Sequence, residues 1–253
     1  MPQYVLARHV FVCMQGEHVV FLDVRKDRYF ALESVRTAGL GQFVPGWPVR
    51  APWSVDYVQH TSGSTAPAMA AEPDRGALSA VISLLLERGI LSTEVTGGKH
   101  ATPVVSEPLR GDVTADALDE RPSIGPGILL RFASAAVRAR LLLKYRTFET
   151  VVERVRQRSD VPHSTARTLP DNRLHHLVNA FGTLRPFFFT AKDACLFDAL
   201  ALSEFLAGYG VFPRWFFGVQ SRPFAAHCWL QMDGVVLNDT VDHVSRYTPI
   251  MIV

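Results

Sequence analysis

Cys195 stands at the start of a segment whose residue types and spacing suit a catalytic thiol. The segment CLFDALALSEFLAGYG has apolar residues at helical spacing and ends on glycines, which predicts a helix. Thr190 and Asp193, just before it, have the form of a helix N-terminal capping box. Unpaired amide N–H groups and the positive dipole end at such a terminus favour a thiolate and can hold an oxyanion. Cys195 is therefore a candidate nucleophile, the alternative being a small apolar residue packed under a helix.

His227 and Asp239 have the types needed to activate that thiol. A thiol nucleophile needs an imidazole to take its proton, and the imidazole needs a third group to fix its tautomer. The two residues lie in the strand-like runs AAHCWLQM and VVLND, with an Asp-Gly pair between the runs. A two-residue turn would set His227 opposite Thr240 and point Asp239 to the other face of the sheet, whereas a three-residue turn over 232–234 sets Asp239 opposite His227. The triad hypothesis therefore predicts the three-residue turn.

The elements that must position these residues indicate an α+β second half. Helical periodicity covers residues 128–145, 148–158 and 171–185, and the helix that begins at Cys195 follows. From residue 211 onward the pattern alternates as it does in strands, through WFFGVQ, AAHCWLQM and VVLND. Helices followed by an antiparallel sheet form an α+β domain.

The first half predicts a smaller domain. Residues 9–32 alternate in three runs that indicate a three-stranded antiparallel meander, and a short helix is expected over 34–44. Residues 60–73 are small, polar and Pro-containing, which is typical of a loop, and a second helix follows over 77–88. Residues 93–127 are rich in Pro and Gly pairs without periodicity over most of their length, which indicates a linker.

Composition and charge exclude several classes of protein. The chain has 253 residues, 48% of them hydrophobic, and a formal net charge of +2, which is unlike a disordered chain or a strongly cationic nucleic-acid binder. No run is long and apolar enough to cross a membrane, and the N-terminus lacks a signal-peptide pattern. We therefore expect a cytoplasmic protein with no nucleic-acid or membrane partner. No GxxxxGK[ST] phosphate loop is present, and we expect no bound cofactor.

The cysteine count supports neither a disulfide framework nor a four-ligand zinc site. The chain has three cysteines, Cys13, Cys195 and Cys228, at irregular spacing. Cys13 is expected in the core, and Cys228 is expected to be buried and inert on the strand face opposite His227. A zinc site from the triad residues with His243 suits the ligand types but lacks paired-ligand spacing, so we expect no metal.

A basic run also needs an explanation. The ordinary explanation is a solvated helix face, and the alternatives are docking of an acidic peptide, of a protein partner or of an anion. Its members are Arg131, Arg138, Arg140, Lys144, Arg146, Arg154, Arg156 and Arg158.

Both halves of the chain resemble parts of one known system. Cys195 opening a helix, with His227-Cys-Trp229 and Asn238-Asp239 on a hairpin, resembles the transglutaminase-like cysteine protease of lasso peptide biosynthesis, the leader peptidase often called the B protein. The run GEHVVFLDVRKDRYFALE resembles the strands of a PqqD-like precursor-peptide recognition element, and ALSAVISLLLERGIL resembles its last helix. Together the two resemblances cover most of the chain except the linker.

The resemblance implies a fold, an activity and partners. It implies a winged-helix-type recognition domain over 1–92, the linker over 93–127, and a papain/transglutaminase-like protease domain over 128–253. Cys195 would be the nucleophile, His227 the general base and then acid, and Asp239 the group that orients the imidazole. Removal of the leader would free the core peptide's amine for a separate ATP-dependent, asparagine-synthetase-like cyclase that closes a macrolactam. Trp229 shares the strand face of His227, and we expect it to wall the active site.

The first domain is expected to bind the leader as an added strand at an open sheet edge, with side chains in a groove beside the helix. The residues expected to contact the leader are Tyr29, Phe30, Ala31, Leu32, Leu84 and Arg88. Plain core packing is the alternative for the apolar strand residues. For the whole chain, two other functions stay open, a recognition scaffold without catalysis and acyl transfer to an amine as in true transglutaminases.

Overall fold

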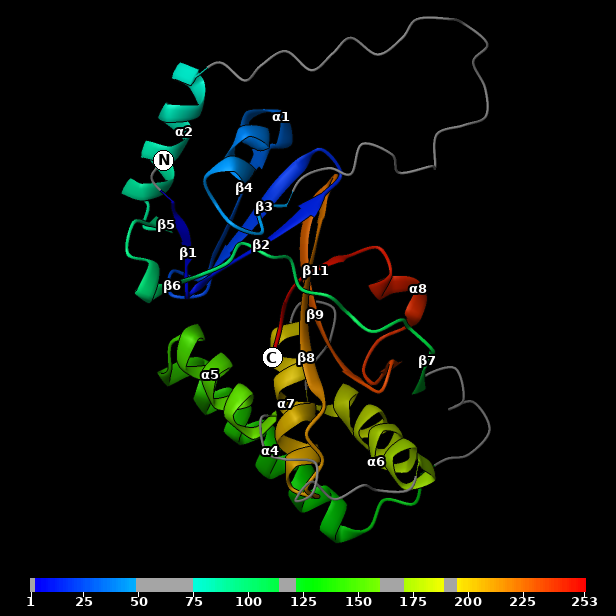
Figure 1. Ribbon diagram of the computed structural model, residues 1–253. Helices are drawn as coiled ribbons and strands as arrows, with labels where there is room; N and C mark the ends of the chain where they lie inside the picture. Colours follow the sequence, from blue (N-terminus) through cyan, green and yellow to red (C-terminus); the bar gives the residue numbers. More distant parts are fainter. Residues whose placement is uncertain (1–2, 49–74, 114–121, 160–170, 189–194) are drawn as a thin grey trace, which may run out of the picture. The chain divides into compact units, whose positions relative to one another are not determined.

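The computed structural model describes residues 3–48, 75–113, 122–159, 171–188 and 195–253 (Figure 1). The chain divides into two compact units, and each is treated by itself below. The first unit comprises Met1–Asp23 and Tyr29–Pro103, and the second comprises Val24–Arg28 and Val104–Val253. The predicted loop over 60–73 and the Thr190–Asp193 capping box lie outside the described residues.

The first unit contains the predicted three-stranded meander. Strands β2 (Val10–Gln15), β3 (His18–Asp23) and β4 (Arg28–Glu33) lie in the order β2-β3-β4, so β4 is an edge strand among the residues that the structure describes. The turn between β2 and β3 uses Gly16, whose φ of 59° lies in the left-handed region that glycine adopts at little cost. The alternating apolar pattern therefore predicted this sheet correctly.

A second, smaller sheet was not predicted. Strand β1 (Val5–Ala7) lies between β5 (Leu91–Ser92) and β6 (Gly98–Lys99), and all pairings are antiparallel. Strands of two or three residues are too short to show an alternating pattern. A 3₁₀ turn, η2 (Val95–Gly97), joins β5 to β6.

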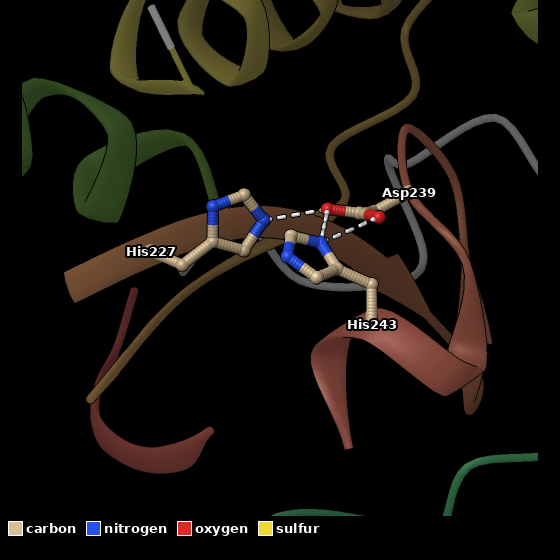
Figure 2. Close-up of side chains that lie close together, drawn as sticks. All are labelled: His227, Asp239 and His243. Carbon is tan, nitrogen blue, oxygen red and sulfur yellow. Dashed lines mark hydrogen bonds and ion pairs between the residues drawn. The ribbon is translucent and has the colours of Figure 1, made fainter. Parts of the chain in front are cut away.

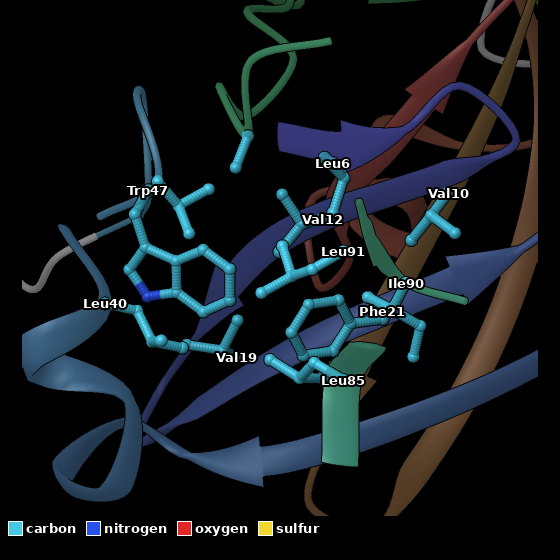
Figure 3. Packing of buried hydrophobic residues seen from close by; sticks show 12 residues of the cluster. Leu6, Val10, Val12, Val19, Phe21, Leu40, Trp47, Leu85, Ile90 and Leu91 are labelled. Atoms are coloured by element: carbon cyan, nitrogen blue, oxygen red, sulfur yellow. The ribbon is translucent and has the colours of Figure 1, made fainter. Parts of the chain in front are cut away.

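The helices of the first unit pack over the meander. The predicted helix over 34–44 is broken into α1 (Ser34–Thr37) and the 3₁₀ helix η1 (Ala38–Gln42), a segment that carries two helix-weakening glycines. Helix α2 (Arg75–Glu87) ends at Gly89, whose φ is 71°. Figure 3 shows the core, in which residues of both sheets and of α2 surround Phe21.

In the described part of the second unit, four long helices precede the antiparallel strands, as predicted. They are α4 (Pro126–Tyr145), α5 (Phe148–Ser159), α6 (Asp171–Leu184), which runs into the 3₁₀ turn η3 (Arg185–Phe187), and α7 (Cys195–Ala207). Residues 198–206 of α7 are all buried, and α7 packs against α4 and against strand β9 (Phe224–Met232). Helix α7 is therefore the central helix of this unit.

The sheet of the second unit has the order β11-β8-β9-β10-β7. Strands β8 (Arg214–Ser221), β9 (Phe224–Met232) and β10 (Val235–Val236) were predicted, although β10 is much shorter than the run VVLND. Strand β11 (Thr248–Ile252) and the short helix α8 (Val241–Val244) were not. The two units together form a mixed α+β protein, as predicted.

The stretch 93–127, predicted as a linker, carries short strands in its described part. The division between the units falls at Pro103, within that stretch. Its first part supplies β6 to the first unit, and β7 (Gly111–Asp112) pairs in parallel with β10 in the second. No helix in the described part of the chain is long and apolar enough to span a membrane.

Candidate active site

Cys195 is the first residue of α7 in the described structure, and its thiol is half-buried. The thiol takes part in hydrogen bonds with the Cys228 thiol and with His227. The Cys228 thiol is the largest influence that lowers the pKa of Cys195, burial opposes it, and the hydrogen bond and charge of His227 lower it further, to about 4. Cys195 is therefore a thiolate at neutral pH.

His227 lies on β9, directly opposite Gly218 of β8. Its Nε2 atom is 2.5 Å from Oδ2 of Asp239, and Figure 2 shows its Nδ1 atom pointing away from that carboxylate. Burial lowers the pKa of His227, but hydrogen bonds to Asp239 and Cys195 outweigh it and raise the pKa to about 9. Because Nε2 is occupied by Asp239, Nδ1 is the ring nitrogen left to face the thiol.

The turn that brings Asp239 to His227 is not the predicted one. Val235 pairs with Met232, so the turn has the two residues Asp233 and Gly234, whose φ angles are 50° and 82°. Both positive values are those of a type I′ turn, for which an Asp-Gly pair is well suited. The prediction of a three-residue turn is therefore wrong.

Asp239 nevertheless reaches His227, because the regular ladder does not extend to it. Strand β10 ends at Val236, and residues 237–239 form a bend. Strict alternation beyond Val236 would have set Thr240 opposite His227. The bend cancels this alternation and returns Asp239 to the face of His227.

A second imidazole holds the same carboxylate. Nδ1 of His243 lies 3.0 Å from Oδ1 and 2.9 Å from Oδ2 of Asp239 (Figure 2). The N–H of Thr240 also donates to Oδ1 at 2.7 Å. His243 lies on α8, whose N-cap is Thr240. Burial raises the pKa of Asp239, but the hydrogen bonds from His227, His243 and the Thr240 N–H overcome it and lower that pKa. Asp239 is therefore an ionised carboxylate with several donors around it.

The same three residues have the donor types of a metal site. One ligand atom from each of His227, Asp239 and His243 lies within 4.8 Å of the others. Two imidazoles and a carboxylate suit zinc. Direct hydrogen bonds between Asp239 and both imidazoles already account for their proximity. The hydrogen-bonded network is thus a sufficient explanation of the cluster.

Aromatic rings enclose His227. Trp229 is stacked on it at 6.1 Å between ring centroids, and Tyr247 lies at 5.2 Å. Gly218 leaves room for both rings, since a Cβ atom there would lie 2.8 Å from Cβ of Tyr247 and 2.9 Å from the Trp229 ring. Trp229 was expected to wall the active site, and the structure places its ring beside His227. Gly218 and Tyr247 were missed, and a glycine in the middle of an apolar strand was the signal for the first of them.

Cys228 has a part in the site that was not predicted. It is buried, on the strand face opposite His227, and burial raises its pKa well above the ordinary value, so it remains a protonated thiol. That thiol hydrogen-bonds to Cys195. The expectation that Cys228 is buried is confirmed, whereas the expectation that it is inert overlooked this hydrogen bond. Cys13 is buried in the first unit, and burial raises its pKa to about 12.

Part of the basic run is structural. Guanidinium groups of three residues of α4 and α5 converge on the buried carboxylate of Glu204 on α7, at 3.2 Å, 3.5 Å and 2.6 Å for Arg138, Arg154 and Arg158 respectively. Arg131 donates to the carbonyl of Gly208 at 2.5 Å. The explanation by a solvated helix face is therefore incomplete, because half of the run holds α4 and α5 to α7. A Glu in an apolar helix was the available signal for this pairing.

The residues predicted to bind a leader lie on β4, on α2 and, for Arg88, directly after the last residue of α2. Phe30 stacks on the core residue Phe21 with ring centroids 4.5 Å apart, and the guanidinium of Arg88 lies 5.9 Å from the centre of the Phe30 ring. Leu32 packs against the core, whereas Ala31 is exposed. Tyr29 and Leu84 are partly buried. The structure thus brings Phe30 and Arg88 together, and leader binding stays a prediction.

A family comparison covers the active-site half of the chain. Residues 134–252 match the model of the transglutaminase-like superfamily. This stretch contains Cys195, His227 and Asp239, so the second unit contains a domain of that superfamily. No curated protein and no solved structure matches the chain.

Proposed function

We propose that this chain, with its transglutaminase-like domain, is a cysteine peptidase that removes the leader from a ribosomally made precursor peptide, as the leader peptidases of lasso peptide biosynthesis do. The observation that carries the proposal is the hydrogen bond of 2.5 Å between His227 Nε2 and Asp239 Oδ2. The Cys195 thiol is hydrogen-bonded to the same imidazole. With a pKa of about 4 for Cys195 and about 9 for His227, the pair is a thiolate and an imidazolium at neutral pH. This is the charge state that a cysteine peptidase needs.

The proposed reaction has two steps. The Cys195 thiolate attacks the carbonyl of the last leader residue, the C–N bond breaks, and the His227 imidazolium gives its proton to the departing amine of the core peptide. Water then attacks the thioester while His227 takes a proton from it, the C–S bond breaks to return the Cys195 thiolate, and the leader leaves with a new carboxylate. Asp239 keeps the imidazole oriented and stabilises its charged form in both steps.

The first unit would hold the leader in this proposal. Strand β4 is an edge of its sheet in the described structure, and an extended peptide can add to such an edge through main-chain hydrogen bonds. Phe30 and Arg88 lie together beside that edge and would contact leader side chains. The freed core amine would pass to a separate ATP-dependent cyclase, which would be the protein partner, in the cytoplasm.

The products of a single reaction distinguish this proposal from its alternatives. The purified protein is mixed with a candidate precursor, a synthetic peptide that corresponds to a short open reading frame next to its gene, and masses are followed with and without an added primary amine. The proposal predicts two fragments whose masses sum to the precursor plus one water. A leader fragment carrying the added amine would instead support acyl transfer, and an intact precursor that binds but is not cut would support a scaffold. Either result would overturn the peptidase proposal.

A further inference from the structure

The bend between β10 and α8 is held by the side chain of Asn238. In a regular antiparallel ladder, Leu230 and Leu237 would exchange two backbone hydrogen bonds. The N–H of Leu237 does donate to the Leu230 carbonyl at 2.9 Å. The N–H of Leu230, however, donates to Oδ1 of Asn238 at 2.8 Å. The Asn238 side chain thus takes the place of a backbone acceptor at the point where the ladder ends.

The other end of the same side chain contacts the nucleophile's helix. Nδ2 of Asn238 donates to Oδ2 of Asp198 at 2.9 Å. Asp198 lies on α7, one turn beyond Cys195, and is 2% exposed. Arg185 donates to the same oxygen at 3.2 Å and fixes the carboxylate from a third element, η3. Asn238 therefore joins the strand that carries His227 to the helix that begins with Cys195.

We propose that Asn238 and Asp198 are positioning residues for the cleavage reaction, an inference that rests on the proposed function. They hold the bend that places Asp239 on His227, and they fix that bend relative to Cys195. Neither residue touches the reacting atoms in this account. Both act through Asp239, which directly follows Asn238 in the chain.

The two-residue turn explains why such a device is needed. With Asp233 and Gly234 as the turn, a ladder that continued past Val236 would direct Asp239 to the far face of the sheet. Without Asp239, burial would lower the pKa of His227 with less opposition. The imidazolium would then be less stable, and the Cys195 thiolate would lose part of its stabilisation. The position of Asp239 beside His227 thus depends on the hydrogen bond from the Leu230 N–H to Oδ1 of Asn238, which replaces a backbone hydrogen bond of the ladder.

The experiment compares Asn238→Ala, Asp198→Asn and the double variant Asp198→Asn/Asn238→Asp with the full-length wild type. The double variant exchanges the donor and the acceptor and leaves the number of charges unchanged. Asn172→Ala, at an exposed position on α6, is the matched control. Three quantities are measured: the pH dependence of Cys195 alkylation by iodoacetamide, kcat and KM on the precursor, and the Tm.

We expect Asn238→Ala to lower kcat about 100-fold, as misplacement of a catalytic group by about 1 Å does, with KM within about twofold of the wild type. The midpoint of alkylation should move up from about pH 4, and the double variant should recover most of kcat and of the midpoint. Asp198→Asn, which hardly changes side-chain volume, should move the midpoint in the same direction even where Asn238→Ala folds poorly.

An unchanged midpoint in both single variants, or a double variant no better than Asn238→Ala, would overturn the inference. A fall in Tm with an unchanged midpoint would show a role in stability alone and would overturn it as well. Alkylation needs no substrate, so this readout separates a failure of positioning from a failure of the proposed peptidase function. In the latter case the wild type would show the low midpoint but would not cleave the precursor.

Discussion

His227 and His243 bind the same carboxylate, that of Asp239, with their rings 4.7 Å apart. Both nitrogens that face Asp239 act as donors when its carboxylate is ionised. His243 thus holds Asp239, the residue proposed to orient His227. The His243 side chain is 41% exposed. The consequence is that Asp239 does not depend on His227 alone for its position.

Replacing His243 should therefore weaken the reaction without abolishing it. His243→Ala removes one of the hydrogen bonds that lower the pKa of Asp239, and the carboxylate gains freedom to turn away from His227. We expect kcat to fall about tenfold, which corresponds to an activation free energy that is higher by roughly 1.4 kcal/mol. Steady-state kinetics on the precursor measure this, with His243→Gln as the variant that keeps a donor. Equal loss in both variants would contradict the role given to the hydrogen bond.

The pH dependence of alkylation and of cleavage should differ. The Cys195 pKa is lowered to about 4, so the rate of iodoacetamide alkylation should rise as pH increases through about 4 and then stay high. Cleavage also needs the His227 imidazolium as the acid, so it should fall again as pH rises through the His227 pKa of about 9. A midpoint of alkylation near the ordinary thiol value of 9.0 would show that no ion pair forms.

Cys228 offers an internal control for this pH dependence. Its thiol hydrogen bond is the largest influence that lowers the Cys195 pKa. Cys228→Ala should therefore move the alkylation midpoint upward, whereas Cys228→Ser keeps a donor and should move it less. Identical midpoints in the two variants would mean that the hydrogen bond contributes nothing.

Gly218→Ala should damage the site by crowding. The added Cβ would lie 2.8 Å from Cβ of Tyr247 and 2.9 Å from the Trp229 ring, so the rings that enclose His227 must shift. Overpacking of this kind costs about 1–3 kcal/mol in the free energy of unfolding. Urea unfolding measures the loss, and kcat should fall with it. Gly127→Ala on α4, where a Cβ meets nothing within 4 Å, is the control and should leave both quantities nearly unchanged.

Glu204→Gln should destabilise the second unit. The carboxylate is buried and binds Arg138, Arg154 and Arg158, and the amide cannot serve the three cations equally well. Hydrogen bonds to charged groups contribute about 1.5–3 kcal/mol, and we expect the lower part of that range because the guanidiniums reach solvent. Thermal unfolding at low and high salt measures the change. Glu153→Gln, an exposed partner of Arg156, should have little effect.

Long periodic elements were predictable from the sequence, and short ones were not. The meander, α2 and the four long helices of the second unit carry enough apolar periodicity to be recognised. Strands β1, β5, β6 and β7 have two or three residues each, and their pairing partners are distant in the chain. Their existence depends on tertiary pairing that no local pattern records.

Residue types and spacing predicted Cys195, His227 and Asp239 as a candidate triad, and the contact between His227 and Asp239 forms by a different route from the one expected. If β10 continued to Asp239 with regular alternation, a three-residue turn would be needed to place Asp239 opposite His227. The strand instead ends at Val236 because the side chain of Asn238 takes the next ladder hydrogen bond from Leu230. A pattern of apolar residues does not show that a side chain, here that of Asn238, takes the place of a backbone carbonyl as the acceptor. The same holds for Glu204, whose three partners come from two other helices.

Cys195 is proposed as the nucleophile of a leader peptidase, and precursor cleavage by the Cys195→Ala variant is the direct measurement of that role. Wild type, Cys195→Ala and the buried-cysteine control Cys13→Ala are each incubated with the precursor, and cleavage is followed by mass while leader binding is measured by fluorescence anisotropy. The account predicts that Cys195→Ala binds the leader with wild-type affinity but produces no fragments, whereas Cys13→Ala still cleaves. Fragments formed by Cys195→Ala at the wild-type rate would contradict it.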